Sequence, residues 1–176
     1  MKSVILFRHG KSDWNAPYGN DHDRPLAKRG VEAAKKMGTF LREKNQIPEL
    51  VISSTAIRAK TTVELAMDSA KWTSKLVLER GIYGGSPDFL LELIHSQDDI
   101  YNSICLVGHE PNFSMFISRA TNDNYVHFTT ANMAKINFDT QKWSRIFFGD
   151  GTLESVSYTH LRAHETRHDL VCRLLL

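Results

Sequence analysis

The sequence predicts an α/β protein: a three-layer sandwich in which a mainly parallel sheet has helices on both faces and an antiparallel edge strand. Short apolar runs of strand type alternate with longer segments whose apolar residues have helical spacing. The first apolar run and the run at 104–107 are continuous, as in strands that are buried on both faces. Near the end of the chain, alternating apolar and polar residues flank a polar turn, which predicts an antiparallel strand pair.

Strand and helix signals alternate through the first half of the chain. Apolar residues at helical spacing, with charges on the other face, predict its longest helix. Pro48 stands before a short apolar run and marks the start of a strand, because the residue before a proline avoids the helical conformation. In chain order we expect a strand at 4–7, a polar loop at 8–25, a helix at 26–44, a strand at 50–52, a helix at 56–70 and a strand at 76–78.

The second half continues the alternation and then changes character. A continuous apolar run ends at Gly108-His109, and the helix after it has Pro111 in its first turn, where proline is tolerated. In chain order we expect a loop at 81–87, a helix at 88–96, a strand at 104–107, a helix at 110–121, and two strands at 134–138 and 144–148 joined by a turn at 139–142.

Composition excludes several classes of protein. The 176 residues are 41% apolar and 24% charged, which is typical of one globular domain, and the net charge of +2 with dispersed Lys and Arg does not indicate a nucleic-acid binder. No apolar run approaches the ~20 residues of a membrane span. Lys2 is the only charged residue before the first apolar run, which does not indicate a signal peptide. Two cysteines, Cys105 and Cys172, make no disulfide framework. We therefore expect a cytoplasmic protein that binds neither nucleic acid nor membrane.

Three polar clusters follow directly on predicted strands. They are Arg8-His9-Gly10, the segment from Ser53 to Arg58, and Gly108-His109. In sheets of this kind, ligands bind beyond the carboxyl ends of the strands, so we expect the three clusters to meet there. Arginine presents a planar fork of donors that matches phosphate oxygens, and histidine acts as a nucleophile, acid or base near neutral pH. A dianionic phosphoryl group is therefore the ligand that this combination favours.

Five motifs in order carry a resemblance to a known family. They are Ile5–Ser12 (ILFRHGKS), Asp23–Leu26 (DRPL) with Gly30, Val51–Ser54 with Arg58–Thr62 (VISS, RAKTT), Leu106–Asn112 (LVGHEPN) and Phe128–Ala131 (FTTA). Together they resemble the histidine phosphatase superfamily, and within it the SixA-type phosphohistidine phosphatases. The similarity runs from residue 2 to about residue 153, and it implies the phosphoglycerate mutase-like version of the fold.

The resemblance implies a role for each matching residue. His9 would be the nucleophile that becomes phosphorylated, Arg8 and Arg58 would bind the phosphoryl oxygens, and His109 would be the second imidazole of the pocket. Neither a metal ion nor a cofactor is implied, because the arginines supply the positive charge that Mg²⁺ supplies in other phosphoryl-transfer sites.

Four further residues are implied to bind substrate. Arg24 would line the substrate entrance, although it could equally brace its own loop. Ser12 and Asn15 stand where larger members of the superfamily have polar residues that line the pocket. Thr130 would shape the edge of the pocket.

A general acid is the part of the site that the motifs do not identify. Glu79 and Asp88 are the candidates, but Glu79 could be a solvated charge at a strand end, and Asp88 could cap a helix after Pro87. A phosphoramidate such as phosphohistidine needs less protonation than an alkyl ester, because its imidazole can leave already protonated. The lack of a clearly identified general acid therefore favours substrates with N–P bonds or activated esters.

The last stretch of the chain departs from the family pattern. It resembles translated sequencing-adapter read-through, so we expect residues 1–155 to form the histidine phosphatase domain and residues 156–176 to be a non-native or disordered tail.

Three functions are consistent with these motifs. The first is a metal-independent phosphatase that removes a phosphoryl group from protein phosphohistidine through a covalent phosphohistidine intermediate on His9. The second is a small-molecule phosphomonoesterase with the same site, whose specificity lies at 81–88 and around Phe128. The third is a phosphate-binding module without turnover.

Overall fold

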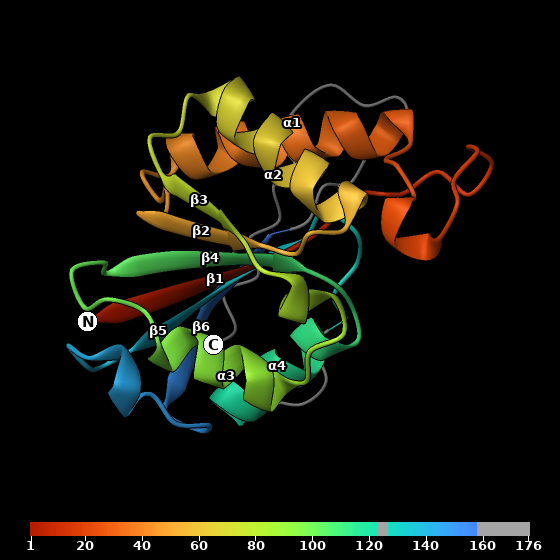
Figure 1. Ribbon diagram of the computed structural model, residues 1–176. Coiled ribbons are helices and arrows are strands. Elements are labelled where there is room, and N and C mark those ends of the chain that lie inside the picture. Colours follow the sequence, from red (N-terminus) through yellow and green to blue (C-terminus); the bar gives the residue numbers. More distant parts are fainter. Residues whose placement is uncertain (123–126, 158–176) are drawn as a thin grey trace.

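A six-stranded sheet forms the middle layer of the computed structural model, which describes residues 1–122 and 127–157 (Figure 1). Across the sheet the strands run in the order β3-β2-β4-β1-β5-β6. The first four of these are parallel, whereas β5 is antiparallel to β1 and β6 is antiparallel to β5. The predicted sheet, mainly parallel with an antiparallel edge, is therefore confirmed. The strands are β1 (Lys2–Arg8), β2 (Leu50–Ser53), β3 (Lys75–Leu78), β4 (Ser103–Gly108), β5 (Met133–Phe138) and β6 (Gly151–Ser157).

Helices cover both faces of the sheet, as the sequence predicts. Figure 1 shows α1 and α2 on one face and α3 and α4 on the other. The predicted helix boundaries agree with the observed ones to within two residues at each end. The helices are α1 (Lys28–Glu43), α2 (Ile57–Ala70), α3 (Pro87–His95) and α4 (Asn112–Thr121), and the short 3-10 turns are η1 (Asp21–Asp23), η2 (Arg80–Tyr83) and η3 (Trp143–Arg145).

Strand β1 lies inside the sheet and is buried on both faces. Val4 and Leu6 belong to the apolar core beneath α3 and α4, whereas Ile5 and Phe7 belong to the core beneath α1 and α2. Successive side chains of a strand point to opposite faces, so a strand between two layers of helices needs apolar residues at every position. This requirement explains the uninterrupted apolar run near the start of the sequence.

The strand predicted at 144–148 is wrong. Residues 144–145 belong to the 3-10 turn η3, residues 146–148 form neither strand nor helix, and the chain pairs with β5 only later, as β6. Trp143 and Ile146 are both buried, three positions apart, because they fill the core from a 3-10 turn. Trp143 also donates from Nε1 to the carbonyl oxygen of Tyr101 at 3.1 Å. The apolar pattern therefore reflects a buried turn and not a strand face.

The last described strand passes the boundary expected at residue 155. Val156 is paired with Ala134, and Ser157 with Met133, so both continue β6. The remaining part of the predicted tail, 158–176, lies outside the described residues. In the described part of the chain, no helix is long and apolar enough to cross a membrane.

Candidate active site

The three polar clusters meet at the carboxyl ends of β1, β2 and β4. Arg8 at the end of β1 is in register with Gly108 at the end of β4. Ser54, just after β2, donates its backbone N–H to Val107 of β4 at 2.9 Å. The parallel register of adjacent strands thus places together residues that are about 50 to 100 positions apart in the sequence, as the strand-end prediction required.

The backbone of His9 is held from three directions. His9 donates its N–H to Gly108 at 3.1 Å and accepts from the N–H of Ala131 at 3.1 Å. The next residue, Gly10, donates to Oγ1 of Thr62 at 2.9 Å, and that hydroxyl donates to the carbonyl oxygen of Arg58 at 2.6 Å. The loop after β1 is thereby tied to β4, to the turn before β5 and to α2.

The His9 ring has a defined tautomer. Its Nδ1 lies 2.7 Å from the carbonyl oxygen of Gly10. A carbonyl oxygen only accepts, so Nδ1 carries the hydrogen and Nε2 keeps a lone pair. Nε2 accepts a hydrogen bond from Nε of Arg58 at 3.3 Å. Burial is the largest effect on the pKa of His9 and lowers it. The hydrogen bond to Gly10 raises the pKa, whereas the nearby arginines lower it further, and the resulting pKa is about 4. The ring is therefore neutral at pH 7, with Nε2 available as a nucleophile.

His109 forms the opposite side of the site. Its ring centroid lies 5.0 Å from that of His9, and its Nε2 is 2.9 Å from Oγ of Ser54. Burial lowers the pKa of His109 well below its usual range, and the adjacent His9 and Arg58 lower it further. Its Nδ1 is buried and has no hydrogen-bond partner among the described residues. The second imidazole is thus neutral, and one of its ring nitrogens is uncommitted.

Arg58 is oriented by a residue that the sequence analysis missed. It donates from Nη1 to the carbonyl oxygen of Asp21 at 2.6 Å and from Nη2 to the Asp21 carboxylate at 2.9 Å. With both terminal nitrogens directed to one residue, the Nε edge of the guanidinium faces His9. Asp21 therefore acts as a positioning residue for Arg58.

Asp21 also joins two other elements to the site. Arg24 donates to Oδ1 of Asp21 from Nη2 at 2.8 Å and from Nε at 3.1 Å, and the hydroxyl of Tyr83 donates to Oδ2 at 2.8 Å. Burial opposes ionisation of this carboxyl, but the surrounding donors outweigh it and lower the pKa of Asp21 to about 2. Tyr83, on η2, also packs edge-on against His109, with ring centroids 5.3 Å apart. The only signal in the sequence was an acidic residue three positions before Arg24 in a polar loop.

Arg8 reaches the site from the end of β1. It donates from Nη1 to the carbonyl oxygen of Phe128 at 2.6 Å, and its charge helps to lower the pKa values of His9 and His109. Arg8 and Arg58 therefore place positive charge around two neutral imidazoles. Such a site favours a dianionic group next to a nitrogen nucleophile.

Comparisons with known proteins point to one superfamily. The profile of the histidine phosphatase superfamily (branch 1) matches residues 4–81, which include His9 and Arg58. An uncharacterized protein of Mycobacterium tuberculosis is 37% identical over 110 residues, a match that spans 61% of this chain and 65% of that protein. Residues 4–81 of the chain thus match the histidine phosphatase superfamily.

Solved structures show that the fold is shared with SixA-type members of this superfamily. A SixA protein of Agrobacterium tumefaciens superposes with a TM-score of 0.77 at 23% identity, covering 90% of this chain and 98% of that one. The protein histidine phosphatase SixA complexed with tungstate gives a TM-score of 0.75 at 21% identity, covering 88% and 95%. The SixA-type fold predicted from the motifs is confirmed by these matches.

The four residues that the sequence analysis expected to bind substrate lie in different environments. Nη1 of Arg24 donates to Oγ of Ser12, and the Arg24 guanidinium lies 3.6 Å from the centre of the Trp14 ring. These contacts agree with the bracing interpretation of Arg24. Asn15 is exposed and donates its backbone N–H to Asp13. Thr130 is half-buried and precedes Ala131, the residue that donates to the His9 carbonyl oxygen.

Both candidate acids have other partners. Glu79 accepts from the backbone N–H of Gly81 at 2.7 Å and so caps η2. Asp88 forms two hydrogen bonds with Arg119, at 2.8 and 2.9 Å, which lower the pKa of Asp88. Ser86, rather than Asp88, caps α3. A carboxyl group that is ionised near pH 7 holds no proton to donate, so these contacts disfavour Asp88 as an acid.

We expect stability to fall as the pH is lowered from about 6.5 toward 4. Between these values an unfolded histidine, with a pKa of about 6.5, binds a proton that folded His9 does not bind. His9→Asn should flatten the fall in unfolding free energy between pH 7 and pH 5, measured by urea denaturation. The control is His127→Asn, which replaces an exposed histidine. An equally steep fall in His9→Asn would contradict the burial of a neutral ring.

Replacing the Asp21 carboxylate should loosen the site. We expect Asp21→Asn to lower the unfolding free energy at pH 7 by about 1 kcal/mol, because its arginine partners are buried. The loss is modest because the Asp21 carboxylate itself is half-exposed to solvent. The folded pKa of Asp21 is lowered, so the difference from wild type should be present above pH 4 and vanish as the pH falls toward 2. Asp23→Asn, an equally exposed neighbour, is the control. Equal losses in both variants would argue against the assigned role.

Proposed function

We propose that the protein is a phosphatase that transfers a phosphoryl group first to Nε2 of His9 and then to water. One observation carries this proposal: burial keeps His9 neutral, and the hydrogen bond from Nδ1 to the Gly10 carbonyl oxygen leaves the lone pair on Nε2, the atom that faces Arg58. A neutral imidazole nitrogen in a positively charged pocket suits attack on phosphorus.

The first step forms an N–P bond and breaks the bond to the leaving group. The lone pair of Nε2 attacks phosphorus, and the leaving group departs with its bonding electrons. Nδ1 of His9 stays protonated, and its bond to the Gly10 carbonyl oxygen stabilises the positive charge of the phosphorylated ring. Water then attacks phosphorus, the N–P bond breaks, and its electrons return to Nε2.

The charged groups around Nε2 would bind the phosphoryl oxygens. Nε of Arg58 already lies 3.3 Å from Nε2, so a phosphoryl group on that nitrogen would come within reach of this donor. Arg8 and the uncommitted Nδ1 of His109 would complete the set, with Nδ1 donating when Ser54 donates to Nε2 of the same ring. These groups neutralise charge on the transferring phosphoryl without a metal ion.

Phosphohistidine on a protein is the substrate that the site favours. Glu79 and Asp88 are committed to other contacts, so a leaving group that needs little protonation fits best, and the imidazole of phosphohistidine is such a group. The likeness to a protein histidine phosphatase complexed with tungstate, a tetrahedral oxyanion, supports the same choice. A small phosphorylated metabolite would use the same oxyanion contacts.

His9→Ala should lower the turnover of an aryl phosphate and of a phosphohistidine peptide by at least about 1,000-fold, because the variant lacks the nucleophile. Rapid acid-free quenching with labelled substrate should trap label on the wild-type protein and none on the variant. The control is His95→Ala, which removes an imidazole from α3 that contacts the Ile146 carbonyl oxygen. Turnover or labelling that survives in His9→Ala would overturn the assignment.

A substrate panel tests the leaving group. We expect kcat/KM to be highest for a phosphohistidine protein, lower for an aryl phosphate, and lowest for alkyl phosphates such as sugar phosphates, because the required protonation increases in that order. Wild type and His9→Ala are measured side by side at one pH. A preference for an alkyl phosphate would favour a small-molecule phosphomonoesterase, and phosphate binding without turnover would favour a binding module.

A further inference from the structure

Strand β3 lies at the edge of the sheet, next to β2. Within residues 1–122 and 127–157, no strand pairs with its outer edge. Two of its apolar side chains are open to solvent: Val77 is 38% exposed and Leu78 is 43% exposed. Open edges with exposed apolar residues are templates for pairing with another strand.

The backbone groups that β3 presents can be identified from its bonds to the rest of the sheet. Lys75 donates its N–H to Glu49 at 3.3 Å, and Glu79 donates its N–H to Ser53 at 2.8 Å. Backbone groups of alternate residues point to opposite sides of a strand. The N–H and C=O groups of Leu76 and Leu78 therefore point away from β2, toward the open edge.

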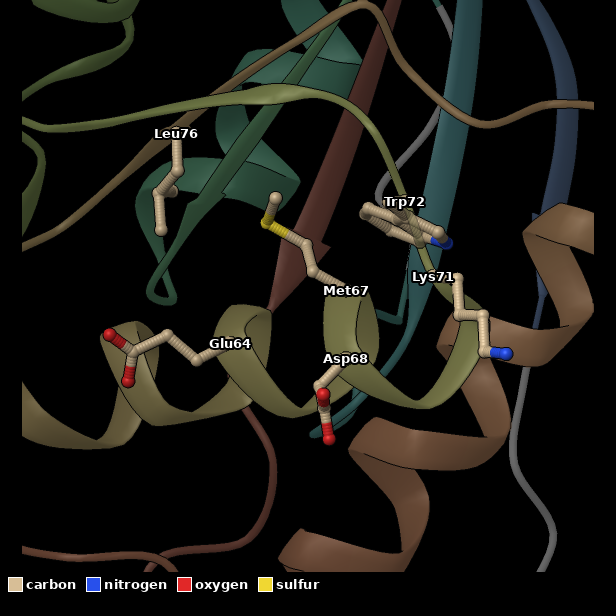
Figure 2. A pocket seen from close by; sticks show the side chains of 6 residues that line it. All are labelled: Glu64, Met67, Asp68, Lys71, Trp72 and Leu76. Carbon is tan, nitrogen blue, oxygen red and sulfur yellow. The ribbon is translucent and has the colours of Figure 1, made fainter.

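A groove of about 400 Å³ lies beside this edge, between β3 and the second half of α2. Figure 2 shows Met67 pointing up from α2 and Leu76 pointing down toward this helix, with Trp72 on the other side of Met67. Leu76 packs on the core cluster beneath α1 and α2, so the groove lies on that face of the sheet. The lining residues are Glu64, Met67, Asp68, Lys71, Trp72 and Leu76.

We propose that the β3 edges of two copies of this chain pair antiparallel, about a two-fold axis at Val77. In this register Val77 faces the partner's Val77, and Leu76 faces the partner's Leu78. Lys75 faces the partner's Glu79, since the backbone of Glu79 continues the extended conformation with φ −129° and ψ 111°. The occupant of the edge is thus a second copy of the same strand.

The register satisfies the outward-pointing backbone groups. Leu76 and the partner's Leu78 exchange both of their N–H to C=O hydrogen bonds, and the two-fold axis repeats the exchange. The Val77 pair at the axis becomes a pair without hydrogen bonds, in which the side chains lie closest. A shift by one residue would instead oppose groups that already point to β2.

The same register places side chains where the surface fits them. Residues directly opposite in an antiparallel pair share one face, so the partner's Leu78 would lie beside Leu76, over the groove lined by Met67 and Trp72. On the other face, Lys75 and the partner's Glu79 have opposite charges, and symmetry forms this pair twice. Glu79 can accept it while its Oε1 accepts from Gly81.

The strand is short, so the association should be weak and should depend on concentration. The two-fold axis directs the carboxyl ends of the two sheets in opposite directions, so both candidate active sites stay open. Dimer formation therefore leaves the phosphatase chemistry of each copy unchanged, and it can be tested independently of the proposed function.

The test compares wild type with Val77→Lys by sedimentation velocity over a range of concentrations. Wild type should change from monomer to dimer as the concentration rises, and Val77→Lys should stay monomeric because two like charges would meet at the axis. Ile100→Lys, which adds a lysine at another exposed apolar position, should dimerise like wild type. Circular dichroism checks that each variant is folded. A wild type that stays monomeric, or a dimer that survives Val77→Lys, overturns the proposal.

A cross-link tests the register. Residues in such a pair without hydrogen bonds have Cα atoms about 4.5 Å apart, which is within the range that a disulfide spans. Val77→Cys should therefore form a disulfide-linked dimer under mild oxidation, whereas Ile100→Cys should not. Wild type reports any background from its own cysteines. Cross-linking of Ile100→Cys as fast as Val77→Cys would show that the contact is not made through β3.

Discussion

The Gly10 carbonyl oxygen accepts a hydrogen bond from Nδ1 of His9, and this contact decides what the neighbouring atoms can do. Because the hydrogen stays on Nδ1, the lone pair is fixed on Nε2, where Arg58 meets it. Burial and positive charge keep the ring neutral at pH 7, so the form with a free lone pair on Nε2 is the resting form. Gly10 must itself be held still for this, and its N–H is bound by Thr62, which is also bound to the first turn of α2.

Asp21 supplies the second constraint, because it joins elements that are far apart in the chain. It receives donors from Arg24 in its own loop, from Arg58 on α2 and from Tyr83 on η2. Two of these are buried guanidinium groups, which need a nearby negative charge to be stable away from water. One partly exposed carboxylate thus compensates the charge of the pocket and sets the direction from which Arg58 approaches His9.

Sequence reasoning predicted the elements whose pattern follows from local geometry. The continuous apolar run of β1 and the helical spacing in α1 each have a direct cause in burial. It failed at 144–148, where Trp143 and Ile146 fill the core from a turn. Their spacing gives an apolar pattern that resembles the alternation of a strand. It also missed Asp21, since the partners of a loop carboxylate depend on which distant donors the fold brings to it.

By itself, the sequence determined which strands are followed by polar residues. It thereby determined that His9, Arg58 and His109 would gather at one edge of a parallel sheet. The reason is that the carboxyl ends of parallel strands coincide whatever the details of packing. Only the tertiary structure decided the tautomer of His9, the pairing of Arg58 with Asp21 and the other commitments of Glu79 and Asp88. These depend on burial and on the directions of individual donors and acceptors, which spacing along the chain does not encode.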